Sequence, residues 1–220
     1  MKLESDGILI ELRPLAERDA IARIFTRDHG VVGGVMRAAQ IAKKNKPLVG
    51  QMGGVIWNAR LDSQLGVFHW EATRNMAAPL MCDAMRLGLM NAAFSLIGTF
   101  LPERESYPNI YAQTVVLLNS LGGENAAAAY LGWEVEFLSG IGYALQLDRC
   151  AGCGGVDDLR YLSPRTARAV CVNCGAPYAD KLYPLPLTFG TTRRLLEHAT
   201  MLMGATIPPA RLMLRDDVKI

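Results

Sequence analysis

Cys150-Ala-Gly-Cys153 and Cys171-Val-Asn-Cys174 are two Cys-x-x-Cys pairs separated by seventeen residues. Each pair can place two sulfurs on one side of a tight turn, and glycines beside both pairs let the backbone wrap around an ion. Four thiolates at this spacing suit tetrahedral Zn²⁺, which binds sulfur at about 2.3 Å. Four protein ligands leave no open position, so the spacing predicts a structural zinc site. Two disulfides or a redox-active Cys-x-x-Cys are the competing interpretations.

The segment between the two cysteine pairs supports a zinc ribbon. Leu159 to Pro164 and Ala169-Val170 have the pattern of two short strands joined by a turn. We therefore expect a small zinc element over residues 148–178 that stabilises the surrounding fold and is not an active centre.

Length and composition limit the class of protein. The 220 residues can form one large domain or two small ones, and half of them are apolar, which allows a packed core. Five cysteines, four of them paired by spacing, favour a reducing compartment. The fifth, Cys82, lies among Met81, Met85 and Leu89 and is expected to be a buried core thiol. No signal-peptide pattern opens the chain, and the apolar run 87–101 is too short to span a membrane, so we expect a cytoplasmic protein.

The first part of the chain has the pattern of short strands. The predicted strands cover residues 7–12, 20–26, 31–36, 53–61 and 66–72. Five short strands, with glycines where a small barrel must bend, predict an OB-fold β-barrel. An SH3-like barrel or a plain meander has the same number of strands and is the alternative.

After Pro79 the apolar residues recur at helical spacing. The predicted helices cover approximately 81–100, 106–121, 125–147 and 191–203. The fold class is therefore α+β, with an OB-fold nucleic-acid-binding domain over 1–78 and a helical domain over 79–220 that carries the zinc element. No low-complexity linker separates the two parts, so we expect them to pack directly on each other.

Positive charge is concentrated in one segment. The formal net charge is +2, yet residues 29–61 contain five basic residues and no Asp or Glu. A local cationic patch in a nearly neutral protein indicates an anionic partner that contacts one region. OB barrels bind single-stranded nucleic acid through such charges together with aromatic stacking. The candidate contacts are Arg37, Lys43, Lys44, Lys46 and Arg60, with Arg23 or Arg27 as extensions.

Two alternatives concern this basic segment and its aromatic neighbours. The lysines can simply be a solvated loop, because no aromatic residue is interleaved with them. The candidate stacking residues can equally belong to the core; they are Phe25, Trp57, Phe68 and Trp70.

Enzymatic motifs are scarce. The sequence has no P-loop, no dinucleotide-binding glycine motif and no Gly-x-Ser-x-Gly elbow. His69-Trp70-Glu71 followed by Cys150-x-x-Cys153 imitates the zinc deaminase signature. Arg149 stands where that signature has proline, and the second cysteine pair would have no purpose. We therefore expect that this protein is not an enzyme.

The order of these parts resembles the RecO family of bacterial DNA repair proteins. The similar segments are Asp6-Gly7-Ile8-Leu9, residues 25–30, the basic stretch after Arg37, residues 101–105, residues 137–145 before Cys150, residues 161–164 and residues 182–186. The resemblance covers nearly the whole chain.

The resemblance implies a recombination mediator that turns over no small molecule. Proteins of this kind bind single- and double-stranded DNA, anneal complementary strands, and act with RecR to help load RecA onto DNA coated by single-strand-binding protein. The resemblance also implies a cytoplasmic, nucleoid-associated bacterial protein whose basic barrel region contacts DNA. A zinc-ribbon adaptor that binds only other proteins is the alternative.

Overall fold

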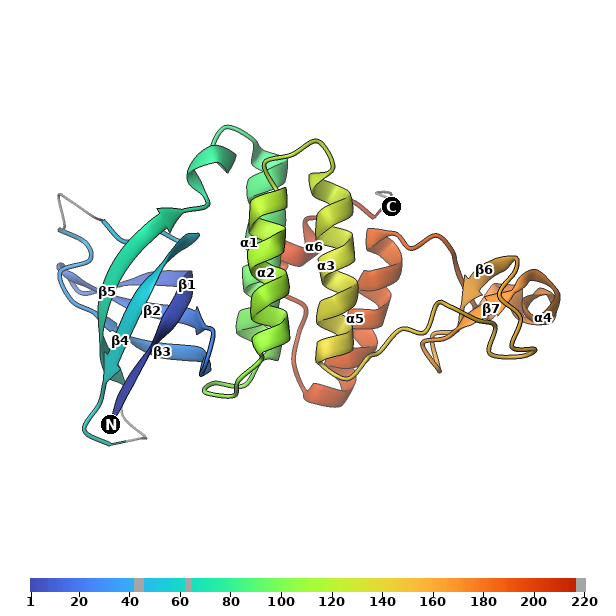
Figure 1. Ribbon diagram of the computed structural model, residues 1–220, viewed down its shortest axis with the longest axis horizontal. Helices are drawn as coiled ribbons and strands as arrows, with labels where there is room; N and C mark the ends of the chain where they lie inside the picture. The colour runs from blue at the N-terminus through green and yellow to red at the C-terminus, as the bar shows by residue number, and fades with distance from the viewer. Residues whose placement is uncertain (42–45, 62–64, 217–220) are drawn as a thin grey trace.

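The computed structural model describes residues 1–41, 46–61 and 65–216. Three parts follow one another along the long axis: a β-barrel at one end, a bundle of helices in the middle, and a small cysteine-containing module at the other end (Figure 1). The order in space is therefore the order in the sequence, except that the last helices return to the bundle.

The barrel has five strands, and their order identifies the OB topology. The strands are β1 (Lys2–Leu15), β2 (Asp19–Thr26), β3 (Gly30–Met36), β4 (Gln51–Asn58) and β5 (Gly66–Asn75). They close in the order β1-β2-β3-β5-β4, with β3 and β5 parallel and the other neighbours antiparallel. A plain meander would keep β4 beside β3, so this alternative is wrong and the predicted OB-like barrel is confirmed.

Alternation along the strands fills the barrel and also builds its junction with the helices. Leu9 and Ile24 point inward, into the cluster that fills the barrel. Ile8, Phe25 and Val31 belong instead to the core that contains the helices. Because side chains alternate along a strand, part of the outer surface of β1, β2 and β3 is buried against the helical bundle. The two parts pack directly on each other, as the sequence suggested.

Sequence signals at their ends explain where the helices begin and stop. The bundle contains η1 (Ala78–Leu80), α1 (Ala84–Phe100), α2 (Pro108–Ser120), α3 (Ala126–Gly140), α5 (Phe189–Met203) and α6 (Pro209–Leu212). Asp83 caps α1 by accepting hydrogen bonds from two backbone N–H groups, and Thr188 caps α5. Gly204, in the left-handed conformation, ends α5.

Two predictions about the helices are wrong. The third helix ends at Gly140, not at 147, because Gly142 adopts a positive φ of 98° and the chain turns away toward the cysteines. The predicted helix 81–100 begins only at Ala84, so Met81, Cys82 and Met85 precede or open the first turn. All three are exposed, and Met81 is 65% exposed. Cys82 is therefore not a core thiol.

A buried ion pair joins the last short helix to the middle of the bundle. Glu134 on α3 and Arg211 on α6 are both fully buried, and the guanidinium donates from Nε and Nη2 to the carboxylate at 2.5 and 2.9 Å. Tyr130 and Thr192 donate further hydrogen bonds to the same carboxylate. These contacts hold α3, α5 and α6 together through polar groups inside an otherwise apolar core.

The cysteine module has its own small sheet. Its elements are β6 (Leu159–Leu162), β7 (Ala169–Cys171), α4 (Val172–Gly175), η2 (Ala176–Lys181) and β8 (Tyr183–Pro184), with sheet order β7-β6-β8. The two strands predicted between the cysteine pairs are thus confirmed. Leu162 is fully buried in the helical core and connects the module to the bundle.

The helices were compared in length and apolar character with membrane-spanning helices. Within the described ranges, none of them combines the length and the apolar character that a bilayer crossing requires.

Candidate metal centre and nucleic-acid interface

The two cysteine pairs converge on one point. The sulfurs of Cys150, Cys153, Cys171 and Cys174 all lie within 4.8 Å of one another. The first pair is carried by a turn in which Gly154 N–H donates to the Cys150 carbonyl at 2.9 Å. The second pair is placed by the end of β7 and the short helix α4, which starts immediately after Cys171. The separation of seventeen residues is what allows strand β6, the turn and strand β7 to bring the pairs together.

This geometry fits a tetrahedral metal ion. Metal–sulfur bonds of about 2.3 Å in a tetrahedron place sulfurs about 3.8 Å apart, and the Cys153 and Cys171 sulfurs are separated by 3.9 Å. That separation is far from a disulfide bond of about 2 Å. The four cysteines can therefore hold one metal ion in a closed, four-sulfur site.

The protonation of the sulfurs is also suited to a cation. Backbone N–H groups, first that of Cys171 at 3.4 Å, lower the pKa of the Cys150 thiol to about 6 because they stabilise its thiolate. The pKa of Cys174 is raised to about 12, because the sulfurs of Cys171, Cys153 and Cys150 share its proton. A second negative charge is therefore disfavoured until a cation enters the cluster.

A glycine is required beside the cluster. A Cβ atom on Gly152 would lie 3.0 Å from the Cys174 sulfur, closer than side-chain atoms normally approach. Gly152 in Cys-x-Gly-Cys therefore makes room for the sulfurs, whereas Gly154 supplies the turn with a positive φ, at 77°, that the sequence suggested for these glycines.

The deaminase alternative loses its geometric basis. His69 lies on β5 of the barrel, and among the described residues the metal-ligand cluster near Cys150 contains only cysteines. The histidine and the first cysteine pair belong to opposite ends of the molecule (Figure 1).

The predicted DNA contacts fall into three groups. Arg37 and Lys46 are exposed on the connection between β3 and β4. Arg60 is exposed just after β4. Lys43 and Lys44 lie outside the described residues. Strand β3 runs parallel to β5, whereas β4 runs antiparallel to it. Arg37 follows the end of β3 and Arg60 follows the end of β4, so the two arginines leave the barrel in opposite directions.

The segment that begins at Arg37 is anchored to the β1–β2 turn. Ala38 N–H donates to the Asp19 carboxylate at 2.8 Å, and Gln40 N–H donates to the Arg18 carbonyl at 3.0 Å. Residues distant in sequence therefore meet at one end of the barrel, and the exposed side chains of Arg18 and Arg37 belong to this end.

Four acidic groups of the barrel gather on a different surface, away from the Asp19 carboxylate. A groove of about 370 Å³ crosses β1, β4 and β5, and its carboxylates come from Glu4, Asp6, Asp28 and Glu71. Arg27 lies in the same groove, where it pairs with Asp6 and Asp28 and holds the pKa of Asp28 below its usual range by hydrogen bonding. Arg27 thus faces acidic neighbours and does not extend the basic segment.

Arg23, the other suggested extension, points into the junction with the helices. Its Nη1 donates to the Gly98 carbonyl at 2.7 Å, and the carboxylates of Glu11 and Glu103 lie within 4 Å of its guanidinium. Its charge is balanced inside the protein.

The aromatic candidates are mostly core residues. Phe25 and Trp57 are at most 1% exposed and Phe68 is buried, whereas Trp70 is partly exposed. The interpretation of these rings as core is therefore right for three of the four. Sequence reasoning missed Arg104, whose guanidinium lies 4.5 Å from the Trp57 ring centroid. Nothing in the local sequence around either residue indicates this pairing.

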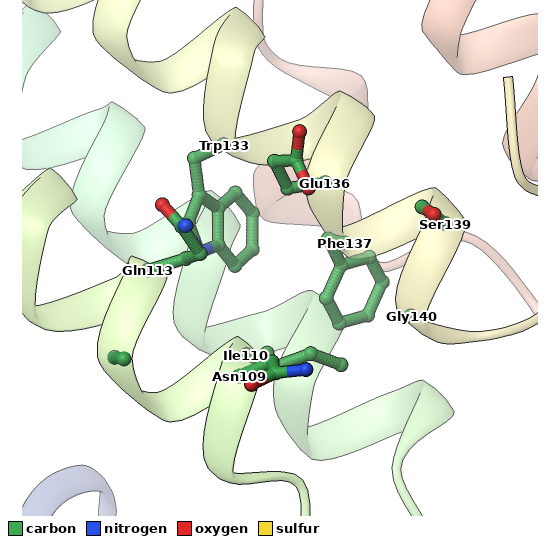
Figure 2. A pocket seen from close by; sticks show the side chains of 9 residues that line it. Asn109, Ile110, Gln113, Trp133, Glu136, Phe137, Ser139 and Gly140 are labelled. Carbon is green, nitrogen blue, oxygen red and sulfur yellow. The ribbon is translucent and has the colours of Figure 1, made fainter. Parts of the chain in front are cut away.

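A hollow between α2 and α3 offers no evident chemistry. Figure 2 shows Trp133 and Phe137 on α3 with Glu136, Gln113 and Asn109 around them. The hollow that these residues line has a volume of about 280 Å³. The two rings are stacked at 5.2 Å, and Trp133 donates a hydrogen bond to Thr114. Its lining residues include no histidine, cysteine, lysine or arginine, so it provides neither a metal site nor an anion site.

Comparison with known proteins assigns the family. Residues 1–74 match the family described as "Recombination protein O N terminal", and residues 81–207 match "Recombination protein O C terminal". The chain belongs to the RecO family. A DNA repair protein RecO of Roseobacter denitrificans is 41% identical over 84% of this chain and 78% of its own length. The RecO of Jannaschia sp. is 39% identical over 84% of this chain and 76% of its own length.

Membership in the RecO family supports a role in DNA repair and recombination. It also agrees with the order of parts seen here, because the N-terminal match covers the barrel up to residue 74 and the C-terminal match covers α1, α2, α3, the cysteine module and α5.

Proposed function

We propose that this RecO-family protein binds single- and double-stranded DNA through basic residues of its barrel and anneals complementary strands. The observation that carries the proposal is the separation of charge on the barrel. Exposed Arg37 and Lys46 belong to a segment without acidic residues, whereas Glu4, Asp6 and Glu71 line a groove on another wall. A polyanion is attracted to the first surface and repelled from the second.

Annealing requires that two backbones approach while their bases remain free to pair. Lys and Arg contacts to phosphates neutralise the repulsion between strands and ignore sequence. Arg37, Lys43, Lys44, Lys46 and Arg60 are the proposed phosphate contacts. Cationic side chains on the barrel are sufficient for this task, and no covalent chemistry is needed.

The proposed ion in the four-cysteine site is Zn²⁺, with a structural role. A closed site has no position for a reacting water or substrate, so the role of the ion would be limited to stabilising the module. Its distance from the barrel, at the opposite end of the molecule (Figure 1), agrees with a role apart from the proposed DNA contacts.

Further partners follow from family membership. We propose that the protein acts with RecR, contacts single-strand-binding protein, and thereby helps RecA to load on gapped DNA in the bacterial cytoplasm, at the nucleoid. The supporting observation is the match to both parts of the RecO family. Co-elution of the purified protein with RecR in size-exclusion chromatography tests the first of these contacts.

Filter binding of a labelled single-stranded oligonucleotide at several salt concentrations tests DNA binding. In the triple variant Lys43→Ala, Lys44→Ala, Lys46→Ala we expect weaker binding, because three phosphate contacts are removed. Each contact contributes about 0.7 to the slope of log K against log salt for single strands, so the slope should fall by about 2.

The matched control is Arg27→Ala. Arg27 is also an exposed barrel arginine, but it is paired with Asp6 and Asp28, so its removal should leave affinity and slope unchanged. An unchanged slope in the triple variant would remove these lysines from the interface. Absence of binding by the folded wild-type protein, even at low salt, would favour a protein-binding adaptor instead.

A further inference from the structure

Arg104 is held in one position by the barrel, although it belongs to the connection between α1 and α2. Its backbone N–H donates to the Val31 carbonyl at 2.8 Å, and Glu103 forms a strand-like bridge with Val31. Arg104 has a positive φ of 63°, a conformation that costs free energy for a residue with a side chain. Gly30 contacts this connection so closely that a Cβ atom there would collide with the Glu105 carbonyl. The connection is therefore fitted to the edge of β3.

The Arg104 side chain covers an indole ring that closes the barrel. Trp57 is 1% exposed, and its Nε1 donates to the Gly33 carbonyl at 3.0 Å. The ring lies against Gly66, at the beginning of β5. The Arg104 guanidinium is 4.5 Å from the ring centroid, and Arg104 keeps part of its surface accessible. The indole is therefore shielded from solvent, whereas Arg104 is only partly shielded.

The described residues that flank the β4–β5 connection include a cation and two apolar side chains. Arg60 is exposed three residues after Trp57. Leu61 and Leu65 are also exposed, at 60% and 54%.

We propose that the Arg104 guanidinium, supported by Trp57, is a stacking platform for one unpaired base of single-stranded DNA, with Arg60 contacting the adjacent phosphate. The inference rests on the proposed DNA binding and deepens it, because it assigns a base contact to a residue of the helical part. Guanidinium planes stack on nucleobases, and the connection between β4 and β5 is a site where OB barrels meet oligonucleotides. An indole behind the guanidinium keeps its plane in a fixed orientation.

The test compares two oligomers of equal length and charge, oligo(dT) and an abasic deoxyribose-phosphate chain, in fluorescence anisotropy titrations. The wild-type protein should prefer oligo(dT) by about tenfold, the usual scale of stacking one base. Arg104→Gly removes the guanidinium and accepts the positive φ, so the backbone keeps its path. Arg104→Lys keeps the charge and loses the plane. Both variants should lose most of the preference, and Arg104→Lys should retain the wild-type salt slope.

The Arg27→Ala variant is the control and should prefer oligo(dT) as strongly as the wild type. Equal binding of the two oligomers by the wild type would overturn the platform and leave the proposed DNA binding intact. Retention of the preference in Arg104→Gly would do the same. If the folded wild type binds neither oligomer, the proposed function and this inference fail together.

Discussion

The barrel and the cysteine module are both small β structures at opposite ends of the molecule, but different forces hold them together (Figure 1). The barrel encloses a full apolar cluster that includes Leu9, Ile24 and Trp57, and its strands close on themselves. The buried core of the module consists of Cys150, Val170 and Cys171. Such a small core buries too little apolar surface to offset the loss of chain entropy.

The difference shows why four cysteines are concentrated where apolar residues are scarce. A bound metal can contribute the folding free energy that a small module lacks. The barrel needs no such help, and it shares a further core with α1 through Ile8 and Phe25. The helical bundle in the middle of the molecule is stabilised by its junction with the barrel and by the ion pair between Glu134 and Arg211.

Loss of a bound metal should have the largest effect and should destabilise the cysteine module but not the barrel. In Cys171→Ser, or after treatment with a chelator, we expect the module to unfold because structural zinc sites contribute on the order of 10 kcal/mol to folding. Limited proteolysis should then cut within residues 148–182 while the barrel stays resistant. The control is Cys82→Ser, which changes an exposed cysteine outside the cluster. Equal protection of the module with and without metal would show that its small core suffices.

Removal of one partner of the buried ion pair should have the next largest effect. Glu134→Leu leaves the Arg211 charge buried and uncompensated, so thermal or urea unfolding should show a loss of about 3–5 kcal/mol. The double variant Glu134→Leu, Arg211→Met removes both charges and should recover most of the loss. If the double variant is as unstable as the single one, the specific hydrogen bonds matter more than the buried charge.

Ionisation of Tyr111 should weaken the barrel junction by a smaller amount. Tyr111 is buried beside Phe25, with ring centroids 5.5 Å apart, and burial raises its pKa to about 12 from an ordinary value of 10. The folded state therefore favours the neutral phenol. This contribution is complete below pH 10 and is lost as the pH rises toward 12. After allowance for solvent screening it is about 1–2 kcal/mol.

Urea unfolding of wild type and Tyr111→Phe between pH 9 and pH 12 measures this contribution. The wild type should lose more stability than the variant over this interval, since other tyrosines and lysines titrate equally in both proteins. Parallel curves would mean that the Tyr111 hydroxyl reaches solvent in the folded protein.

Local patterns were sufficient to predict much of the fold. The strands alternate along the barrel, the helices carry capping residues, and the cysteine spacing predicts one four-sulfur site, because each of these depends on neighbours in sequence. Prediction was wrong where a local pattern competed with chain geometry. The helical spacing of apolar residues continues past Gly140, but Gly142 turns the backbone away. Met81 and Met85 fit the helical spacing of the apolar residues of α1, yet they lie before or in its first turn and are exposed.

The sequence by itself determined the kinds of structure in this protein, a closed β-barrel, a helical bundle and a four-cysteine cage, together with the acid-free basic segment. Only the tertiary structure decided which faces meet. These contacts are the hydrogen bond of Arg23 to Gly98 in the junction, the pairing of Arg27 with acidic groups, the placement of Arg104 over Trp57, and the contact of Glu134 with Arg211 across 77 positions. These contacts join residues far apart in sequence, and their energies depend on burial and orientation that no local pattern encodes.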